Sequence, residues 1–105
     1  MYKLYIAVLD TVPDYMVPTL VAHSVLGAHL TFNNKSNEYD AWLKDSFKKV
    51  VLKVNAKEFE KILCIPSIYL GYENTTLGGT NSCIILAPRE AYPNVIKFAK
   101  MWKPE

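Results

Sequence analysis

The first third of the chain, residues 2–32, constrains the fold most strongly. It reads YKLYIAVLDTVPDYMVPTLVAHSVLGAHLTF and holds only three fully charged residues, one lysine and two aspartates. The continuous apolar run at 3–9 predicts a strand that is buried on both faces. Pro13 prevents that strand from continuing and marks a loop. The segment is typical of the core of an α/β domain.

A long apolar helix is predicted after this loop, beginning near Pro18, because proline is tolerated in a first helical turn. Its apolar residues cover nearly the whole circumference, which predicts packing on more than one side. Gly27 in the middle costs about 1 kcal/mol relative to alanine. We expect it where a neighbouring element approaches closely.

The rest of the chain continues in the order β-α-(α)-β-α-β-β-α. The first two strands are joined through helices and should be parallel, whereas the last two are joined by a Gly-Gly loop and should be antiparallel. The predicted fold is a single α/β domain over 1–105, a three-layer α-β-α arrangement around a four-stranded mixed sheet. The remaining predicted elements are a short helix capped by Asn37 and anchored by Trp42 and Phe47, a strand at 48–54, a helix with an Asn55/Glu58 capping box, strands at 67–72 and 81–87, and a final helix that reaches Trp102.

Composition restricts the function classes only loosely. Hydrophobic residues make up 50% and charged residues 21%, as in ordinary globular domains. The net charge of +2 is too small to identify a nucleic-acid binder, and with eleven lysines and one arginine, phosphate recognition would rest on lysine. Without a signal-peptide pattern or a long apolar run, we expect a cytoplasmic chain with no membrane contact. Cys64 and Cys83 predict two buried reduced thiols, with a disulfide or metal site as the alternative.

Four segments together resemble the type II peptidyl-tRNA hydrolase superfamily. They are the opening KLYIAVLDTVPDYM, the small-residue helix pattern AHSVLGA around His23, Trp42 with the later KKVVLKVNAKEFEKIL, and the closing NSCIILAPREAYPNVIKFAKMWKP. The chain is also similar to small proteins of that fold that lack the family's lysine-rich loop. The resemblance implies a fold of this type and hydrolysis or binding of peptidyl-tRNA.

The chain departs from the family pattern where the resemblance implies catalysis. The family's loop before the first helix carries a catalytic lysine, whereas this chain reads Asp14-Tyr15-Met16-Val17 there. A glutamine on the first helical turn is replaced by Leu20. The scaffold is therefore retained, while most of the catalytic set is changed.

Candidate site residues follow from this comparison. The resemblance implies that Glu73 stands in for a family aspartate, Thr75 or Thr76 for a threonine, and Ser82 for a hydroxyl on the last strand. The predicted catalytic residues are Glu73, Thr76, Ser82 and His23. The predicted substrate-binding residues are Asp14, Tyr72, Lys48 and Lys49, and no metal or cofactor is expected.

Each candidate also has a purely structural interpretation. His23 could be a packed histidine that bonds a backbone carbonyl. The loop that contains Glu73 and Thr76 could be a plain hairpin connection. The lysines could belong to the solvated faces of a strand and a helix.

Two functions therefore remain. The first is a type II peptidyl-tRNA hydrolase-like protein that hydrolyses or binds peptidyl-tRNA, tRNA ends or other RNA. The second is a non-catalytic binding protein on the same scaffold, with a possible homodimer. The discriminating feature is the loop at 10–17: a pocket shared with Glu73, Thr76 and Ser82 favours the enzyme, whereas Met16 and Leu20 filling that space favours the binding protein.

Overall fold

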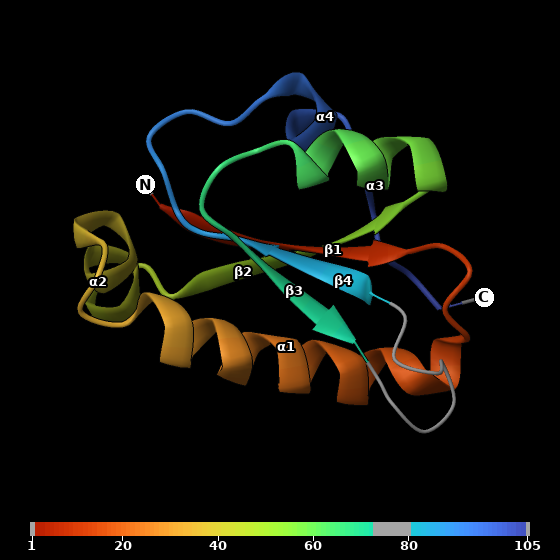
Figure 1. Cartoon of the computed structure of the whole chain (residues 1–105), viewed down its shortest axis with the longest axis horizontal. Coiled ribbons are helices and arrows are strands. Elements are labelled where there is room, and N and C mark those ends of the chain that lie inside the picture. The colour runs from red at the N-terminus through yellow and green to blue at the C-terminus, as the bar shows by residue number, and fades with distance from the viewer. Residues whose placement is uncertain (1, 73–80, 105) are drawn as a thin grey trace.

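The fold is organised around a five-stranded mixed sheet in the order β3-β4-β1-β2-β5 (Figure 1). A computed structural model describes residues 2–72 and 81–104. The predicted α/β class is confirmed. The predicted count of four strands is wrong, because residues 100–101, near the end of the chain, form a short fifth strand. The strands are β1 Lys3–Leu9, β2 Lys48–Val54, β3 Ile68–Tyr72, β4 Asn81–Leu86 and β5 Lys100–Met101.

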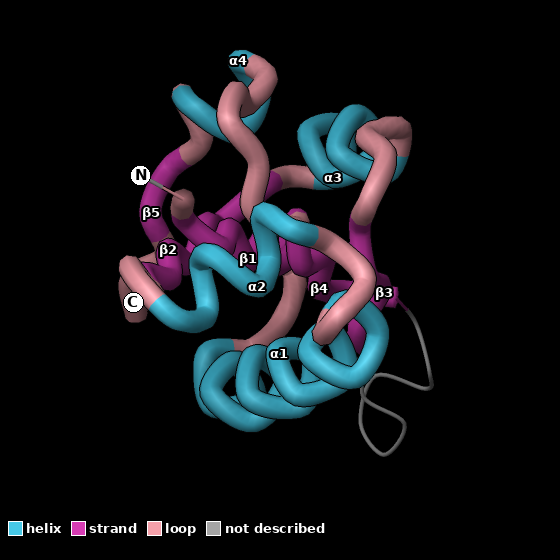
Figure 2. The backbone as a smooth tube through the Cα atoms, turned by 90° about the vertical axis from the view of Figure 1, so that its left-hand side faces the viewer, coloured by secondary structure: helices cyan, strands magenta, loops and turns pink. Residues whose placement is uncertain are grey.

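Helices cover both faces of this sheet (Figures 1 and 2). One face packs against α1 and α2 through a core cluster that includes Leu20 and Trp42. The other face packs against α3 and α4 through a second cluster that includes Phe59 and Ile96. The helices are α1 Val17–Phe32, α2 Asn37–Lys44, α3 Ala56–Leu63 and α4 Asn94–Lys97, and a short 3₁₀ turn, η1, spans Asp14–Met16 before α1.

Strand β1 is central and belongs to both cores. It pairs in parallel with β2, as predicted, and antiparallel with β4. Strand β4 in turn pairs antiparallel with β3, also as predicted. Side chains alternate across a strand, so Ile6 and Val8 enter the cluster under α1 while Ala7 enters the cluster under α3. The continuous apolar run thus reflects burial on both faces.

Helix α1 buries one face only, contrary to the sequence-based expectation. Its residues Leu20, Ser24 and Ala28 are buried at a spacing of four and face the sheet. Leu26 and Leu30 on the opposite side are 62% and 73% exposed. The long apolar circumference therefore does not mean that the helix is enclosed.

The final helix is much shorter than predicted. Helix α4 ends at Lys97, and after Ala99 the chain enters β5, where the amide of Trp102 donates a hydrogen bond to the carbonyl oxygen of Val51 at 2.9 Å. Here pairing with the free edge of β2 replaced continuation of the helix. The apolar spacing that suggested a helix at this end of the chain belongs to a turn and an edge strand.

The predicted anchors and caps are confirmed in part. Trp42 is 1% exposed and its indole N–H donates to the carbonyl oxygen of Lys48 at 2.7 Å. Phe47 is 53% exposed and does not enter the core, but its ring lies against that of Trp42, with the ring centroids 5.3 Å apart. Helix α2 is capped by Ser36, whose hydroxyl accepts the Tyr39 amide hydrogen, and not by Asn37. The capping box of α3 is present.

Helix α1 packs closely against β3 at two glycines, one on each element. A methyl group at Gly27 would collide with the Tyr69 hydroxyl, as expected for a glycine beside a close neighbour. A methyl group at Gly71 on β3 would collide with the side chain of Ser24. Ser24 and Gly71 are thus matched in size across the contact.

We predict that Gly71→Ala lowers the free energy of unfolding by about 1–3 kcal/mol, because the added carbon meets Ser24 atoms held close to the helix backbone. Ser24→Ala should be neutral or stabilising, since the buried Ser24 hydroxyl has no hydrogen-bond partner among the described residues. Urea denaturation of the two single variants measures both effects. Unchanged stability in Gly71→Ala would contradict this packing.

The two thiols differ, although both were predicted to be buried. Cys83 on β4 is fully buried, whereas Cys64 at the end of α3 is exposed, and neither forms a disulfide. Burial raises the pKa of the Cys83 thiol to about 11. A thiol reagent at mildly alkaline pH should therefore label Cys64 rapidly and Cys83 only after denaturation, because a two-unit rise lowers the thiolate fraction roughly a hundredfold. Rapid labelling of both thiols in the folded protein would contradict the burial.

Candidate functional site

The carboxyl ends of the two parallel strands form the edge of the sheet where a ligand site is expected. Strand β1 ends at Leu9 and β2 at Val54, and the amide of Asp10 donates to the Val54 carbonyl oxygen at 2.8 Å. Asp10 is therefore fixed beside the end of β2. The start of β5 reaches the same edge, because Lys100 pairs with Lys53.

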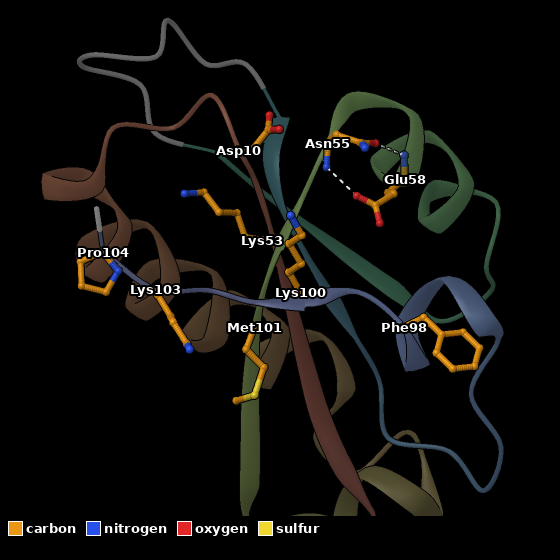
Figure 3. Close-up of a pocket in the computed structure, with 9 residues that line it drawn as sticks. All are labelled: Asp10, Lys53, Asn55, Glu58, Phe98, Lys100, Met101, Lys103 and Pro104. Carbon is orange, nitrogen blue, oxygen red and sulfur yellow. Dashed lines mark hydrogen bonds between the residues drawn. The ribbon is translucent and has the colours of Figure 1, made fainter.

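A broad hollow of about 660 Å³ lies at this edge (Figure 3). Its walls come from the end of β1, the end of β2, the first turn of α3, and the segment that contains β5. Figure 3 shows Phe98 at one end of that segment and Pro104 at the other. The lining residues are Asp10, Lys53, Asn55, Glu58, Phe98, Lys100, Met101, Lys103 and Pro104.

Two carboxylates and three lysines line the hollow, but the carboxylates differ. Glu58 is part of the α3 capping box: its Oε1 accepts the Asn55 amide hydrogen at 2.9 Å, and Asn55 Oδ1 accepts the Glu58 amide hydrogen at 2.8 Å. Asp10 is exposed at the end of β1 and its carboxylate is not part of this cap. Asp10 is thus the better placed of the two to act on a ligand.

Lys53 and Lys100 lie directly opposite each other in the antiparallel β2–β5 pair. Directly opposed residues of such a pair have Cβ atoms about 5 Å apart on the same face of the sheet, and like charges there are unfavourable. Figure 3 shows the Lys100 side chain extending toward Asp10 and Asn55 and that of Lys53 turning in another direction. The arrangement concentrates positive charge at this edge, which is favourable for holding an anion.

Only some of the predicted site residues are placed at this edge. Asp14 begins η1, in the connection that leads from β1 to α1, and is partly exposed. Tyr72 ends β3 at the same edge of the sheet. Glu73 and Thr76 lie outside the described residues, so their predicted roles stay predictions.

Ser82 and His23 do not meet each other. Ser82 is 3% exposed on β4, and its hydroxyl has no hydrogen-bond partner among the described residues. Because it alternates with Cys83, which joins the core under α1, Ser82 faces the α3 side of the sheet. His23 is exposed on α1, on the other side of the sheet. The interpretation of His23 as a packed histidine is therefore wrong.

Lys48 and Lys49 lie at the opposite end of β2 from the hollow. They pair with Lys3 and Leu4 at the start of β1, about 20 Å from the carboxyl edge for a strand of seven residues. The Lys49 ammonium lies 3.2 Å from the centroid of the Phe47 ring and donates to the Phe47 carbonyl oxygen at 2.7 Å. The structure does not bring these two lysines to the edge site.

The loop at 10–17 presents apolar side chains to the protein interior. Met16 is 7% exposed and Leu20 is fully buried, and both belong to the core cluster between α1 and the sheet. Met16 and Leu20 therefore contribute packing and supply no polar group. Polar chemistry at this edge must come from other residues, among them the exposed Asp10 and the partly exposed Asp14 of the same loop.

Sequence reasoning missed most of the residues that line the hollow. Asp10 and Asn55 carried a usable signal, since each directly follows a predicted strand. Lys100 falls within the final helix that the sequence predicts, so the pattern gives no sign of its place on the edge strand β5. Lys53 falls within the predicted strand at 48–54, where nothing distinguishes it from other surface lysines.

A second hollow, of about 420 Å³, lies between α1, α2 and the start of β2 and is almost entirely apolar. His29 at its wall shares a hydrogen bond of 2.9 Å between its Nδ1 and the Tyr39 hydroxyl. Within residues 2–72 and 81–104, no three acidic, histidine or cysteine side chains gather in a way that could hold a metal ion. No helix in the described part of the chain is long and apolar enough to cross a membrane.

The chain is similar to the peptidyl-tRNA hydrolase of Nanoarchaeum equitans (strain Kin4-M). The two proteins are 35% identical over 80 residues, which cover 67% of this chain and 70% of that protein. The chain belongs to the peptidyl-tRNA hydrolase family. No protein-family model matches the chain. This finding confirms, at the family level, the relationship that the sequence predicted. The hollow at the carboxyl edge can therefore be considered as a candidate site for the reaction of that family.

We predict that Lys100→Gln raises the free energy of unfolding at low ionic strength, by about 0.5 kcal/mol, because it removes a like charge directly opposite Lys53. The gain should shrink as salt is added, since salt screens the repulsion. Lys97→Gln is the matched control, because Lys97 is an exposed lysine that lies before β5 and therefore has no directly opposed residue on β2. A Lys100→Gln protein less stable than the wild type at low salt would contradict the repulsion.

Proposed function

We propose that this chain is a type II peptidyl-tRNA hydrolase whose reaction takes place at the carboxyl edge of β1 and β2. Family membership supports the reaction class. The order of strands and helices and the segment resemblances described above support the type II subclass. The hollow at the edge offers a carboxylate beside several ammonium groups, which is a suitable set for ester hydrolysis.

In the proposed reaction, water attacks the carbonyl carbon of the ester that joins the peptide to the tRNA ribose. The Asp10 carboxylate takes a proton from the attacking water, as a general base does. The oxyanion that forms on the carbonyl oxygen is stabilised by the ammonium groups of Lys53 and Lys100. Collapse of this intermediate breaks the bond to the ribose oxygen, which takes up a proton and leaves as the hydroxyl of free tRNA.

The observation that carries the proposal is the opposed lysine pair beside Asp10. The resemblance implies a catalytic lysine from the loop before α1, and this chain has none there. Lys53 and Lys100 supply positive charge from β2 and β5 at the same edge. The missing charge is thus provided by different elements of the same scaffold.

Other predicted residues complete the proposal. Asp14 and Tyr72 lie at the same edge and are proposed to contact the substrate, and Glu73 and Thr76 remain proposed catalytic residues. The tRNA substrate would place the protein in the cytoplasm. A homodimer stays a prediction.

A second candidate function is non-catalytic binding of tRNA ends on the same scaffold. The burial of Met16 and Leu20 favours it, because these side chains occupy the space that the sequence comparison assigned to polar catalytic groups. It differs from the first candidate in one respect only: the edge would hold the substrate without cleaving it.

We predict that Asp10→Asn lowers the turnover of peptidyl-tRNA by about a hundredfold or more, because loss of a general base costs two to four orders of magnitude. Lys100→Met should lower turnover by at least about tenfold, since it removes charge stabilisation of the oxyanion. The measurement is the release of free tRNA from a defined peptidyl-tRNA by purified protein.

Matched controls are Asp45→Asn and Lys35→Met, two exposed residues on the α2 side of the molecule. Both should leave turnover unchanged. Wild-type turnover in Asp10→Asn would remove Asp10 from the mechanism. Absence of turnover in the folded wild type, with tRNA binding retained, would select the second candidate.

A further inference from the structure

We propose that Phe98 is a stacking platform for an unpaired base at the 3′ end of the RNA substrate, with Lys103 holding a phosphate farther along the strand. This inference rests on the proposed function, because it assigns the hollow at the carboxyl edge to an RNA strand. It adds a specificity element that neither the resemblance nor the family relationship supplies.

Phe98 is unusually exposed for a residue on a well-anchored backbone. Its side chain is 80% exposed. Its amide donates to the Asn94 carbonyl oxygen at 3.0 Å, and on its N-terminal side Ile96 is 2% exposed and belongs to the core under α3 and α4. An aromatic ring exposed to water on a fixed backbone contributes little to packing and offers a flat face to a ligand.

Positive charge lies along the same segment. Lys100 and Lys103 follow Phe98 in the chain, and all three line the hollow (Figure 3). The segment is held in place by the hydrogen bond from the Trp102 amide to Val51. An exposed ring followed by lysines on a fixed edge strand is the combination with which proteins bind single-stranded nucleic acid: the ring stacks on a base, and the lysines track the backbone.

The chemistry of the hollow favours RNA over a protein ligand. Three lysines face two carboxylates there, and Glu58 is already bonded within the capping box. An apolar peptide segment would have to bury the lysine ammonium groups of this hollow without neutralising their charge. A flexible strand with a phosphate on each nucleotide matches both the ring and the charges.

The two residues should differ in how they affect binding. Phe98→Leu keeps an apolar side chain but loses the aromatic face, so affinity for a short single-stranded RNA should fall about tenfold with an unchanged dependence on salt. Lys103→Met should weaken binding and reduce the slope of log affinity against log salt by about 0.7, the value for one phosphate contact to a single strand. Phe98→Trp should retain or improve the affinity.

The test is fluorescence anisotropy of a short 5′-labelled single-stranded RNA titrated with wild-type and variant protein over a range of salt concentrations. Phe47→Leu is the matched control, because Phe47 is a second exposed phenylalanine beside a lysine and lies at the far end of β2. It should bind like the wild type. Wild-type affinity in Phe98→Leu would overturn the inference, as would equally tight binding of a polyglutamate peptide.

The outcome separates this inference from the proposed reaction. RNA binding that depends on Phe98, together with no turnover of peptidyl-tRNA, would retain the platform and remove the hydrolase. Normal turnover with RNA affinity that is independent of Phe98 would retain the hydrolase and remove the platform.

Discussion

The parallel pairing of β1 with β2 is the interaction on which the rest of the structure depends. It runs from Lys3 opposite Lys48 to Leu9 opposite Val54, and the Asp10 amide extends it by one more hydrogen bond. The pairing brings together segments that are more than forty positions apart in the sequence. It leaves β2 with an open side, which β5 covers. The candidate site exists because both strands end at the same edge.

The same edge shows a conflict between stability and binding. In the core, residues fit one another closely: a methyl group added at Gly71 would collide with the Ser24 side chain. Lys53 of β2 and Lys100 of the edge strand β5 are instead directly opposed like charges, and Phe98 is an aromatic side chain exposed to water. Exposed rings and opposed like charges that cost stability are features most readily explained by a ligand. Here they gather around one hollow.

The sequence predicted the buried elements well because their patterns record burial. The apolar run at 3–9, the strand at 48–54 and the Asn55/Glu58 cap were predicted from local patterns, and the structure confirms each of them. The end of the chain was not predictable in this way, since the choice between helix and strand after Lys97 was decided by the free edge of β2. The site was hidden for the same reason: Lys100 joins it only through that pairing.

The most direct test of the carboxyl-edge site is a backbone amide NMR titration of the protein with a non-hydrolysable peptidyl-tRNA end analogue. The account predicts that the largest chemical-shift changes fall on Asp10, Asn55 and Lys100, with little change at Lys48 and Lys49. The largest changes around Lys48 and Lys49, with Asp10 and Lys100 unaffected, would place the binding surface at the opposite end of the sheet and contradict it.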